Sequence, residues 1–161
     1  MLIILIRHAI AAPLGGRLVR DQERPLTRRG EERFRQVAKG LAQLLPRPRA
    51  ILTSPLLRAR QTADLAALAW GGPRPQADPA LTSGDWPGLC RALAGYGKDD
   101  TVALVGHENW ISDVTARLLG STSGNAFRYR KGGVAAIEVS GMKSARGRLL
   151  WLIPPKVWRR V

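Results

Sequence analysis

The most constraining feature of this sequence is an apolar run at its start, Leu2 to Ile6, which leads directly into Arg7 and His8. Five consecutive apolar residues that end in charge are typical of a strand buried on both faces. Such strands occur in parallel sheets that are covered by helices on both sides. The run therefore predicts an α/β fold in which a guanidinium and an imidazole stand at the end of a buried strand.

Two further apolar runs are also followed directly by polar or small residues. Ala50 to Thr53 precedes Ser54, and Val102 to Val105 precedes Gly106 and His107, the second of only two histidines. In open α/β sheets, ligands bind beyond the carboxyl ends of the strands. We therefore expect the polar residues that follow these runs to meet at one edge of the sheet.

Helical periodicity lies between the predicted strands. Thr27 is a candidate N-cap of a first helix, whose apolar stripe consists of Phe34, Val37, Ala38, Leu41, Leu44 and Leu45. Ser54-Pro55 resembles an N-cap followed by proline at the first helical position, which predicts a second helix over 55–69. A short helix over 85–94 and a third long helix over 108–119 complete the alternation of strands and helices.

The last apolar segments, 134–139 and 149–153, are separated by a Gly, Ser and basic turn region, which predicts antiparallel strands at or near a sheet edge. Together with the preceding elements, they predict a three-layer α/β/α fold with a mostly parallel central sheet and an antiparallel edge strand. We expect a single domain over residues 1–161, because this length is typical of one domain. The proline-rich connection 71–79 is predicted to be a surface loop.

The charge balance is strongly basic. The sequence has 26 Lys and Arg residues against 12 Asp and Glu residues, which gives a formal net charge of +14. This excess favours an anionic partner, although a solvated basic surface explains it equally well. Nucleic-acid binding is not favoured, because no basic helix, zinc-ligand spacing or aromatic RNA-binding signature is present. A phosphate-binding pocket would need only a few of the arginines.

The cysteine content and the N-terminal segment bear on the compartment. Cys90 is the single cysteine, so no intramolecular disulfide can form, which fits a reducing cytoplasm. The run Leu2 to Ile6 is too short for a signal-peptide core or a membrane span, and no basic leader precedes it. We therefore expect a soluble cytoplasmic protein with no membrane partner.

Four residues at or near the predicted strand ends, Arg7, His8, Arg58 and His107, form a candidate phosphate site. Arginine binds phosphate oxygens through paired donors, and a neutral histidine can attack phosphorus and carry the phosphoryl group. Arg58 falls in the first turn of the second predicted helix, where the helix dipole disfavours a cation, so we expect a functional reason for it. A Gly-rich nucleotide loop and an aspartate cluster for magnesium are both lacking, which argues against kinase and metal-phosphatase chemistry. No metal or cofactor is expected.

Five stretches carry a resemblance to a known family: LIRHA at 5–9, ERPLTRRG at 23–30, LTSPLLRARQTA at 52–63, LVGH at 104–107 and LLWLIPP at 149–155. In this order and spacing they resemble the histidine phosphatase superfamily, and within it the SixA type of small bacterial phosphohistidine phosphatase. The resemblance spans nearly the whole chain. It implies a phosphoglycerate mutase-like fold and a metal-independent phosphatase, a hydrolase that acts through a phosphohistidine enzyme intermediate.

The family pattern implies a role for each matching residue of the site. His8 would be the nucleophile that becomes phosphorylated, and Arg7 and Arg58 would hold the transferred phosphate. His107 would face His8 across the phosphoryl group. Arg24 would be an additional phosphate ligand, as in SixA-like members, with a salt bridge inside its loop as the alternative.

The chain departs from the family pattern at several places. Ala9 stands where the commonest motif has glycine, and Glu108-Asn109 replaces the more usual residues after the second histidine. Larger relatives supply a carboxylic acid from a long insertion, which is nearly absent here between residues 71 and 100. Asp85 is the first candidate general acid and Glu108 the second, with a surface or capping role as the alternative for each.

The shortness of this region leaves little chain to cover the site. It favours a phosphorylated side chain of another protein as the substrate, above all phosphohistidine, whose protonated imidazole leaves readily. Inorganic phosphate would be the product. The alternative substrate is a small phosphorylated metabolite or nucleotide, and the alternative class is a non-catalytic protein that binds phosphate or nucleic acid.

Overall fold

A six-stranded sheet forms the centre of the protein in the computed structural model, which describes residues 1–15, 20–142 and 146–158. The strands are β1 (Leu2–Arg7), β2 (Ala50–Thr53), β3 (Gln76–Ala77), β4 (Thr101–Gly106), β5 (Val134–Glu138) and β6 (Arg148–Ile153). Their order in the sheet is β3-β2-β4-β1-β5-β6. Parts of the predicted loop after residue 10 and of the turn after residue 139 lie outside the described residues.

The pairing of the strands follows the prediction. β1 pairs in parallel with β4, and β2 pairs in parallel with both β4 and β3. β5 is antiparallel to β1, and β6 pairs antiparallel with β5 at the edge. The mostly parallel sheet with an antiparallel edge strand is thus confirmed. β3 was not predicted, because its two exposed residues lie in a proline-rich connection without strand periodicity.

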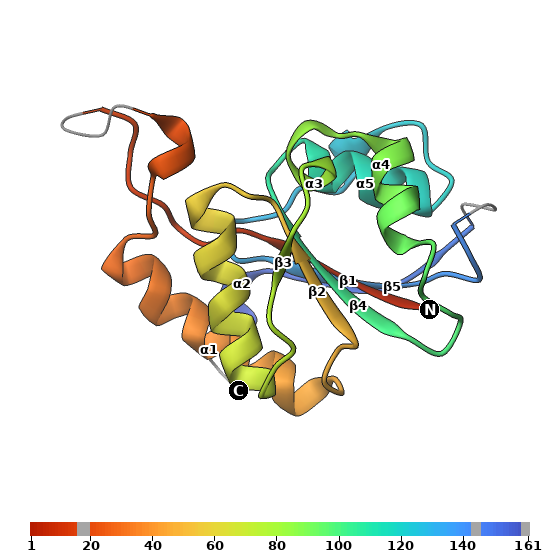
Figure 1. Ribbon diagram of the computed structural model, residues 1–161, viewed down its shortest axis with the longest axis horizontal. Coiled ribbons are helices and arrows are strands. Elements are labelled where there is room, and N and C mark those ends of the chain that lie inside the picture. The colour runs from red at the N-terminus through yellow and green to blue at the C-terminus, as the bar shows by residue number, and fades with distance from the viewer. Residues whose placement is uncertain (16–19, 143–145, 159–161) are drawn as a thin grey trace.

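Helices cover both faces of the sheet, which confirms the three-layer arrangement (Figure 1). They are α1 (Arg28–Leu44), α2 (Leu57–Trp70), α3 (Ala80–Ser83), α4 (Trp86–Leu93), α5 (Trp110–Leu118) and α6 (Pro155–Trp158). On one face, α1 and α2 share an apolar cluster with Ile4 and Ile6 of β1. On the other face, α4 and α5 pack with Ile3 and Leu5. Successive residues of a strand point to opposite faces, so β1 is buried on both sides.

The start of α1 is tied to the segment that follows His8. Thr27 is the N-cap, as predicted, and its Oγ1 accepts a hydrogen bond from the backbone N of Gly30 at 3.0 Å. The backbone N of Thr27 donates to the carbonyl O of Ile10 at 2.9 Å. A Cβ at Gly30 would collide with the same carbonyl, so glycine is needed for this close approach. The helix thereby fixes the chain just beyond the first histidine.

Two helix starts and the end of one apolar stripe differ from the prediction. Leu56, not Ser54, is the N-cap of α2, and the Ser54 Oγ lies within hydrogen-bond distance of His107. α5 begins later than predicted, because Asn109 adopts a positive φ of 67° that no helix can contain. Leu44, in the last turn of α1, is 53% exposed, since the stripe has passed the edge of the core there.

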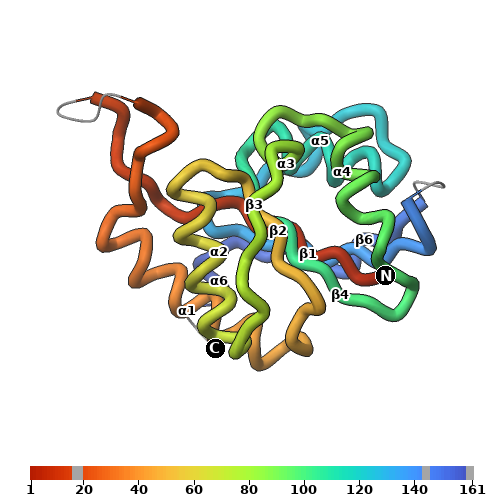
Figure 2. The backbone as a smooth tube through the Cα atoms, in the orientation of Figure 1, coloured from red at the N-terminus to blue at the C-terminus, as the bar shows by residue number. Residues whose placement is uncertain are grey.

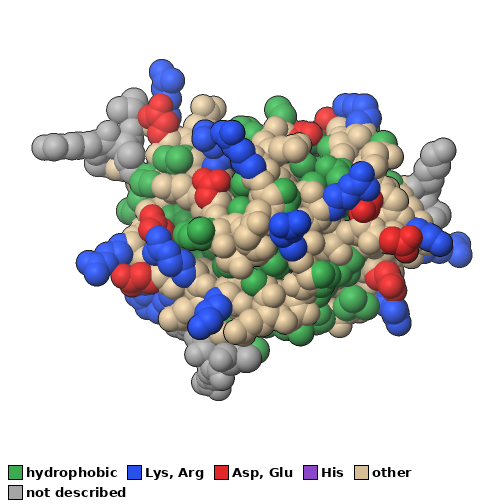
Figure 3. All heavy atoms as spheres, turned by 60° about the horizontal axis from the view of Figure 1, so that its bottom comes forward, with side chains coloured by type: hydrophobic (Ala, Val, Ile, Leu, Met, Phe, Trp, Pro, Cys, Tyr) green, Lys and Arg blue, Asp and Glu red, His purple; other side chains and the backbone are tan. Residues whose placement is uncertain are grey.

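The outer surface shows how the C-terminal region and the charges are arranged. α6 packs against α1 (Figure 2), where the Trp158 ring lies against Gly40. Lys and Arg side chains are spread over the face seen in Figure 3, with no single basic patch. Among the described residues, no helix has both the length and the apolar character that a membrane span requires.

Candidate active site

The carboxyl ends of β1 and β4 bring the two histidines together. Arg7 of β1 lies opposite Gly106 of β4 in the parallel register, and His8 and His107 follow directly. The centroids of the two imidazole rings are 5.1 Å apart, and the ring planes are inclined by 56°. The two histidines that follow β1 and β4 therefore lie close together, as predicted.

His8 is buried and its neutral ring is held in one tautomer. The residue is 7% exposed, and its Nδ1 lies 2.7 Å from the carbonyl O of Ala9. A carbonyl only accepts hydrogen bonds, so Nδ1 carries the proton and Nε2 keeps its lone pair. Burial lowers the pKa of His8 from 6.5 to about 3, although the hydrogen bond to Ala9 acts in the opposite direction. The charges of His107, Arg58 and Arg7 lower it further, so the imidazole is neutral near pH 7.

His107 is supported by two hydroxyl groups. Its Nε2 lies 2.8 Å from the Oγ of Ser54, and this Oγ lies 2.8 Å from the Oγ1 of Thr82. Burial lowers the pKa of His107 to about 4, and the charge of Arg58 acts in the same direction. The other ring nitrogen, Nδ1, is buried and has no hydrogen-bond partner among the described residues. The hydroxyl groups therefore orient the ring through Nε2, and the hydrogen-bonding capacity of Nδ1 is not used by any described residue.

Arg58 presents a buried guanidinium group to the site, and Arg7 presents a partly buried one. The Nη1 of Arg7 lies 2.7 Å from the Oε2 of Glu108 and donates to the carbonyl O of Tyr129. Arg58, with a side chain only 7% exposed, donates from Nη1 and Nη2 to the carbonyl O and Oδ2 of Asp21, at 2.8 and 3.0 Å. The Nε atoms of both arginines are buried without a hydrogen-bond partner in the described part of the chain. Buried donors of this kind are suited to bind an oxyanion.

Asp21 links Arg24 to this group of residues. Its Oδ1 accepts from the Nε of Arg24 at 2.7 Å, while its Oδ2 accepts from Arg58. Burial alone would raise the pKa of Asp21, but the hydrogen bonds and charges of Arg58 and Arg24 lower it, so the carboxylate is ionised. The loop salt bridge considered for Arg24 is therefore formed. Asp21 itself was not predicted, and its spacing of three residues from Arg24 was the only signal.

The two candidate general acids occupy different surroundings. Asp85 is the N-cap of α4, and its Oδ1 accepts a hydrogen bond from the backbone N of Gly88 at 2.9 Å. This is the capping role that the sequence offered as the alternative to a general acid. Glu108 lies in the site, where it pairs with Arg7 and its Oε1 accepts from the Oγ of Ser112 at 2.6 Å. No three His, Cys, Asp or Glu side chains within the described ranges are grouped so as to hold a metal ion.

The departure from glycine at Ala9 is accommodated by the core. Ala9 is 2% exposed and belongs to the apolar cluster beneath α1 and α2. Its backbone N donates to the Oγ1 of Thr62 at 3.1 Å, and this hydroxyl donates to the carbonyl O of Arg58 at 2.7 Å. Thr62 thus connects the segment after His8 to the first turn of α2. Thr62 belongs to the stretch 52–63 that carries the family resemblance, but no role was predicted for it.

The lowered pKa values predict that the protein loses stability in acid. The unfolded chain protonates both histidines near pH 6.5, whereas the folded protein protonates His8 and His107 only near pH 3 and 4. As the pH falls below 6.5, the unfolded state therefore binds more protons than the folded state. The free energy of unfolding decreases progressively as a result, until the pH reaches the pKa values of the two histidines in the folded protein. We expect the urea midpoint to fall between pH 7 and pH 4. A double variant, His8→Asn with His107→Asn, should show a smaller fall, and an equal fall would contradict these pKa values.

The fold and the histidine pair define a class of phosphate-releasing enzyme. Residues 3–94 match the model of the histidine phosphatase superfamily (branch 1), and the chain belongs to this superfamily. It is a phosphatase, a hydrolase that releases phosphate from phosphorylated substrates. This membership favours an enzyme over the non-catalytic alternative.

Similar proteins extend the match over nearly the whole chain. An uncharacterized protein of Picosynechococcus sp. is 34% identical over 152 residues, which cover 92% of this chain and 88% of the relative. The protein histidine phosphatase SixA, solved with tungstate, is 24% identical with a TM-score of 0.84, covering 98% of this chain and 99% of SixA. A phosphoserine phosphatase mutant from Entamoeba histolytica, solved with phosphoserine, is 17% identical with a TM-score of 0.72. The match covers 96% of this chain and 98% of the phosphoserine phosphatase. These likenesses confirm the predicted phosphoglycerate mutase-like fold.

Proposed function

We propose that the protein hydrolyses phosphorylated substrates through a phosphohistidine intermediate on His8, without a metal ion. The observation that carries this proposal is the state of His8, a buried neutral imidazole with a free Nε2 lone pair. It lies beside a second imidazole and within the electrostatic reach of Arg58 and Arg7. A nucleophile for phosphorus needs both the lone pair and nearby cations that draw the anionic phosphoryl group to it.

The reaction would proceed in two displacements. The phosphoryl oxygens bind to Arg7 and Arg58, with Arg24 as an additional ligand, and the Nε2 of His8 attacks phosphorus. The bond between phosphorus and the leaving group breaks, and the phosphoryl group stays on His8. Water then attacks phosphorus, the bond to Nε2 breaks, and inorganic phosphate leaves. His107 faces the transferring group and stabilises its charge through hydrogen bonding.

A phosphohistidine side chain of another protein is the substrate that this site fits best. Phosphate esters need a proton donor for the departing oxygen. The Glu108 carboxylate is held at 2.7 Å by Arg7, and the Asp85 carboxylate caps its own helix, which leaves neither candidate suited to donate. The second ring nitrogen of a phosphohistidine takes a proton from solvent near neutral pH, so that neutral imidazole departs when the bond between nitrogen and phosphorus breaks, without an acid from the enzyme. The fold shared with SixA supports the same substrate class.

The test compares substrates under metal-free conditions. Purified protein with EDTA should release phosphate from a phosphohistidine peptide with a kcat/KM well above the values for a phosphoserine peptide, sugar phosphates and nucleotides. Tungstate, an oxyanion that mimics phosphate, should inhibit competitively. Preference for a sugar phosphate or nucleotide would replace the proposed substrate with the small-metabolite alternative. Activity that requires an added metal ion would overturn the mechanism.

A further inference from the structure

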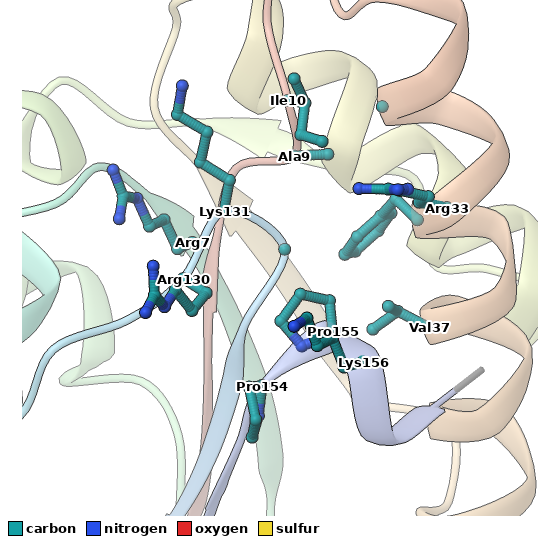
Figure 4. A pocket seen from close by; sticks show the side chains of 13 residues that line it. Arg7, Ala9, Ile10, Arg33, Val37, Arg130, Lys131, Pro154, Pro155 and Lys156 are labelled. Atoms are coloured by element: carbon teal, nitrogen blue, oxygen red, sulfur yellow. The ribbon is translucent and has the colours of Figure 1, made fainter. Parts of the chain in front are cut away.

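A groove of about 600 Å³ opens beside the proposed active site (Figure 4). It is lined by α1, residues 130–132 and residues 154–156, and is called the α1 groove below. Arg7 and Ala9, the two neighbours of His8 in the chain, also line it. The groove therefore begins next to the point where the proposed mechanism binds the phosphoryl group.

The interior of the α1 groove is apolar. Pro155, which is partly exposed, lies opposite the fully buried Val37 of α1, and the partly exposed Ile10 lies at the end nearer to Ala9 (Figure 4). Phe34 contributes to the same wall of α1. An apolar side chain of a ligand would lose contact with water against Ile10 and Pro155, which favours its binding.

Basic side chains surround this interior on several sides. Arg33 projects from α1, Lys131 from the turn before β5, and Lys156 from α6 (Figure 4). Among the described residues that line the groove, none is acidic. Lys131 and Lys156 are exposed, and within the described part of the chain neither takes part in an ion pair. The groove thus combines an apolar interior with positive charge that a ligand could neutralise.

We propose that the α1 groove binds the segment of the substrate protein beside its phosphohistidine, and that this segment carries carboxylates and an apolar side chain. The proposal rests on the function proposed above. Carboxylates of the segment pair with Lys131 and Lys156, while its apolar side chain packs against Ile10 and Pro155, which are partly exposed. The part of α1 that lines the groove runs from Gly30 to Val37, which are two helical turns, or about 10 Å, apart along the helix axis. About three residues of an extended peptide span this length.

Other anionic ligands match the groove less well. A single-stranded nucleic acid is held by bases that stack on exposed aromatic rings. The aromatic side chain of the groove, Phe34, is 1% exposed and packed in the core, so its ring is not free to stack. A free phosphorylated metabolite would use the positive charge but not the apolar length. A short acidic and apolar peptide uses both.

The test measures kcat/KM for three kinds of substrate. Two are phosphohistidine peptides. The first carries aspartates and a leucine next to the phosphohistidine, and it is made in two versions, with these residues before or after the phosphohistidine. The second carries serines at the same positions. The third is phosphoramidate, which is too small to reach the groove. The charge-reversal variant is Lys131→Glu with Lys156→Glu. The matched control is Lys39→Glu with Lys98→Glu, which makes the same charge change at exposed positions that do not line the groove.

We expect the native protein to prefer the acidic peptide about tenfold, because two surface charge pairs contribute roughly this factor. The groove variant should lose this preference while its phosphoramidate hydrolysis stays unchanged, and the control should behave like the native protein. Equal use of both peptides by the native protein, or equal losses in the groove variant and the control, would overturn the docking proposal alone. If the native protein hydrolyses none of the three substrates, the proposed function itself fails.

Discussion

Replacing His8 with asparagine is expected to lower kcat for phosphohistidine-peptide hydrolysis at least about 10⁴-fold, the scale seen when a catalytic nucleophile is removed. The amide nitrogen of asparagine has no free lone pair, so the covalent intermediate cannot form. Asparagine still offers an N–H to the carbonyl of Ala9, which His8 bonds at 2.7 Å, so the fold should persist. Rapid-quench labelling with a ³²P-phosphorylated peptide measures the effect. The native protein should carry label that is stable to alkali and lost in acid.

Two controls make this result specific. Circular dichroism and urea unfolding at pH 7 should show that His8→Asn remains folded. His107→Asn should slow turnover but still become labelled, because the nucleophile is retained. Full labelling of the His8 variant would identify a different nucleophile and contradict the proposed mechanism.

Removing the Arg58 guanidinium is expected to lower kcat/KM about 10²- to 10³-fold. The side chain is only 7% exposed, and its buried Nε has no hydrogen-bond partner among the described residues. A donor fixed in this way does not have to reorganise when charge develops on the phosphoryl oxygens. Steady-state kinetics of Arg58→Ala measures the loss. Arg58→Lys should recover only part of the activity, because an ammonium cannot donate through a planar fork.

The neighbouring Arg60 provides a matched control for this variant. It lies on the same helix and is exposed, so Arg60→Ala changes the net charge equally without altering the site. Its kcat/KM should stay within about twofold of the native value, as expected for an exposed position. A comparable loss in Arg58→Ala and Arg60→Ala would mean that overall charge, not phosphate binding, controls the rate.

The sheet and the meeting of the histidines were predictable from the sequence because backbone geometry decides them. Leu2 to Ile6 has no polar residue that could face water, so the strand has to be covered on both sides. Once β1 and β4 are parallel neighbours, the residues that follow them must lie side by side. Thr27 was predictable as a cap for a similar reason, since its partner, the backbone N of Gly30, is only three residues away.

The polar supports of the site were not predictable in the same way. Ser54 before a proline matches a helix cap, and the sequence cannot reveal that its hydroxyl bonds to His107, which is distant in the chain. That contact depends on the register of β2 and β4. Asp21 lies in a loop without periodicity, so its position against Arg58 is a property of the tertiary structure.

The carboxylates that hold the arginines bear on how a turnover ends. Asp21 and Glu108 together oppose the charges of Arg7, Arg24 and Arg58, and the neutral histidines add none near pH 7. In the proposed mechanism, one positive charge of these five groups is therefore left to face a phosphate dianion. Inorganic phosphate has the same anionic oxygen atoms as the phosphoryl group. Three guanidiniums with no carboxylates beside them would therefore retain it. In the proposed mechanism, the two carboxylates compete with phosphate for these donors, and we expect them to limit product inhibition.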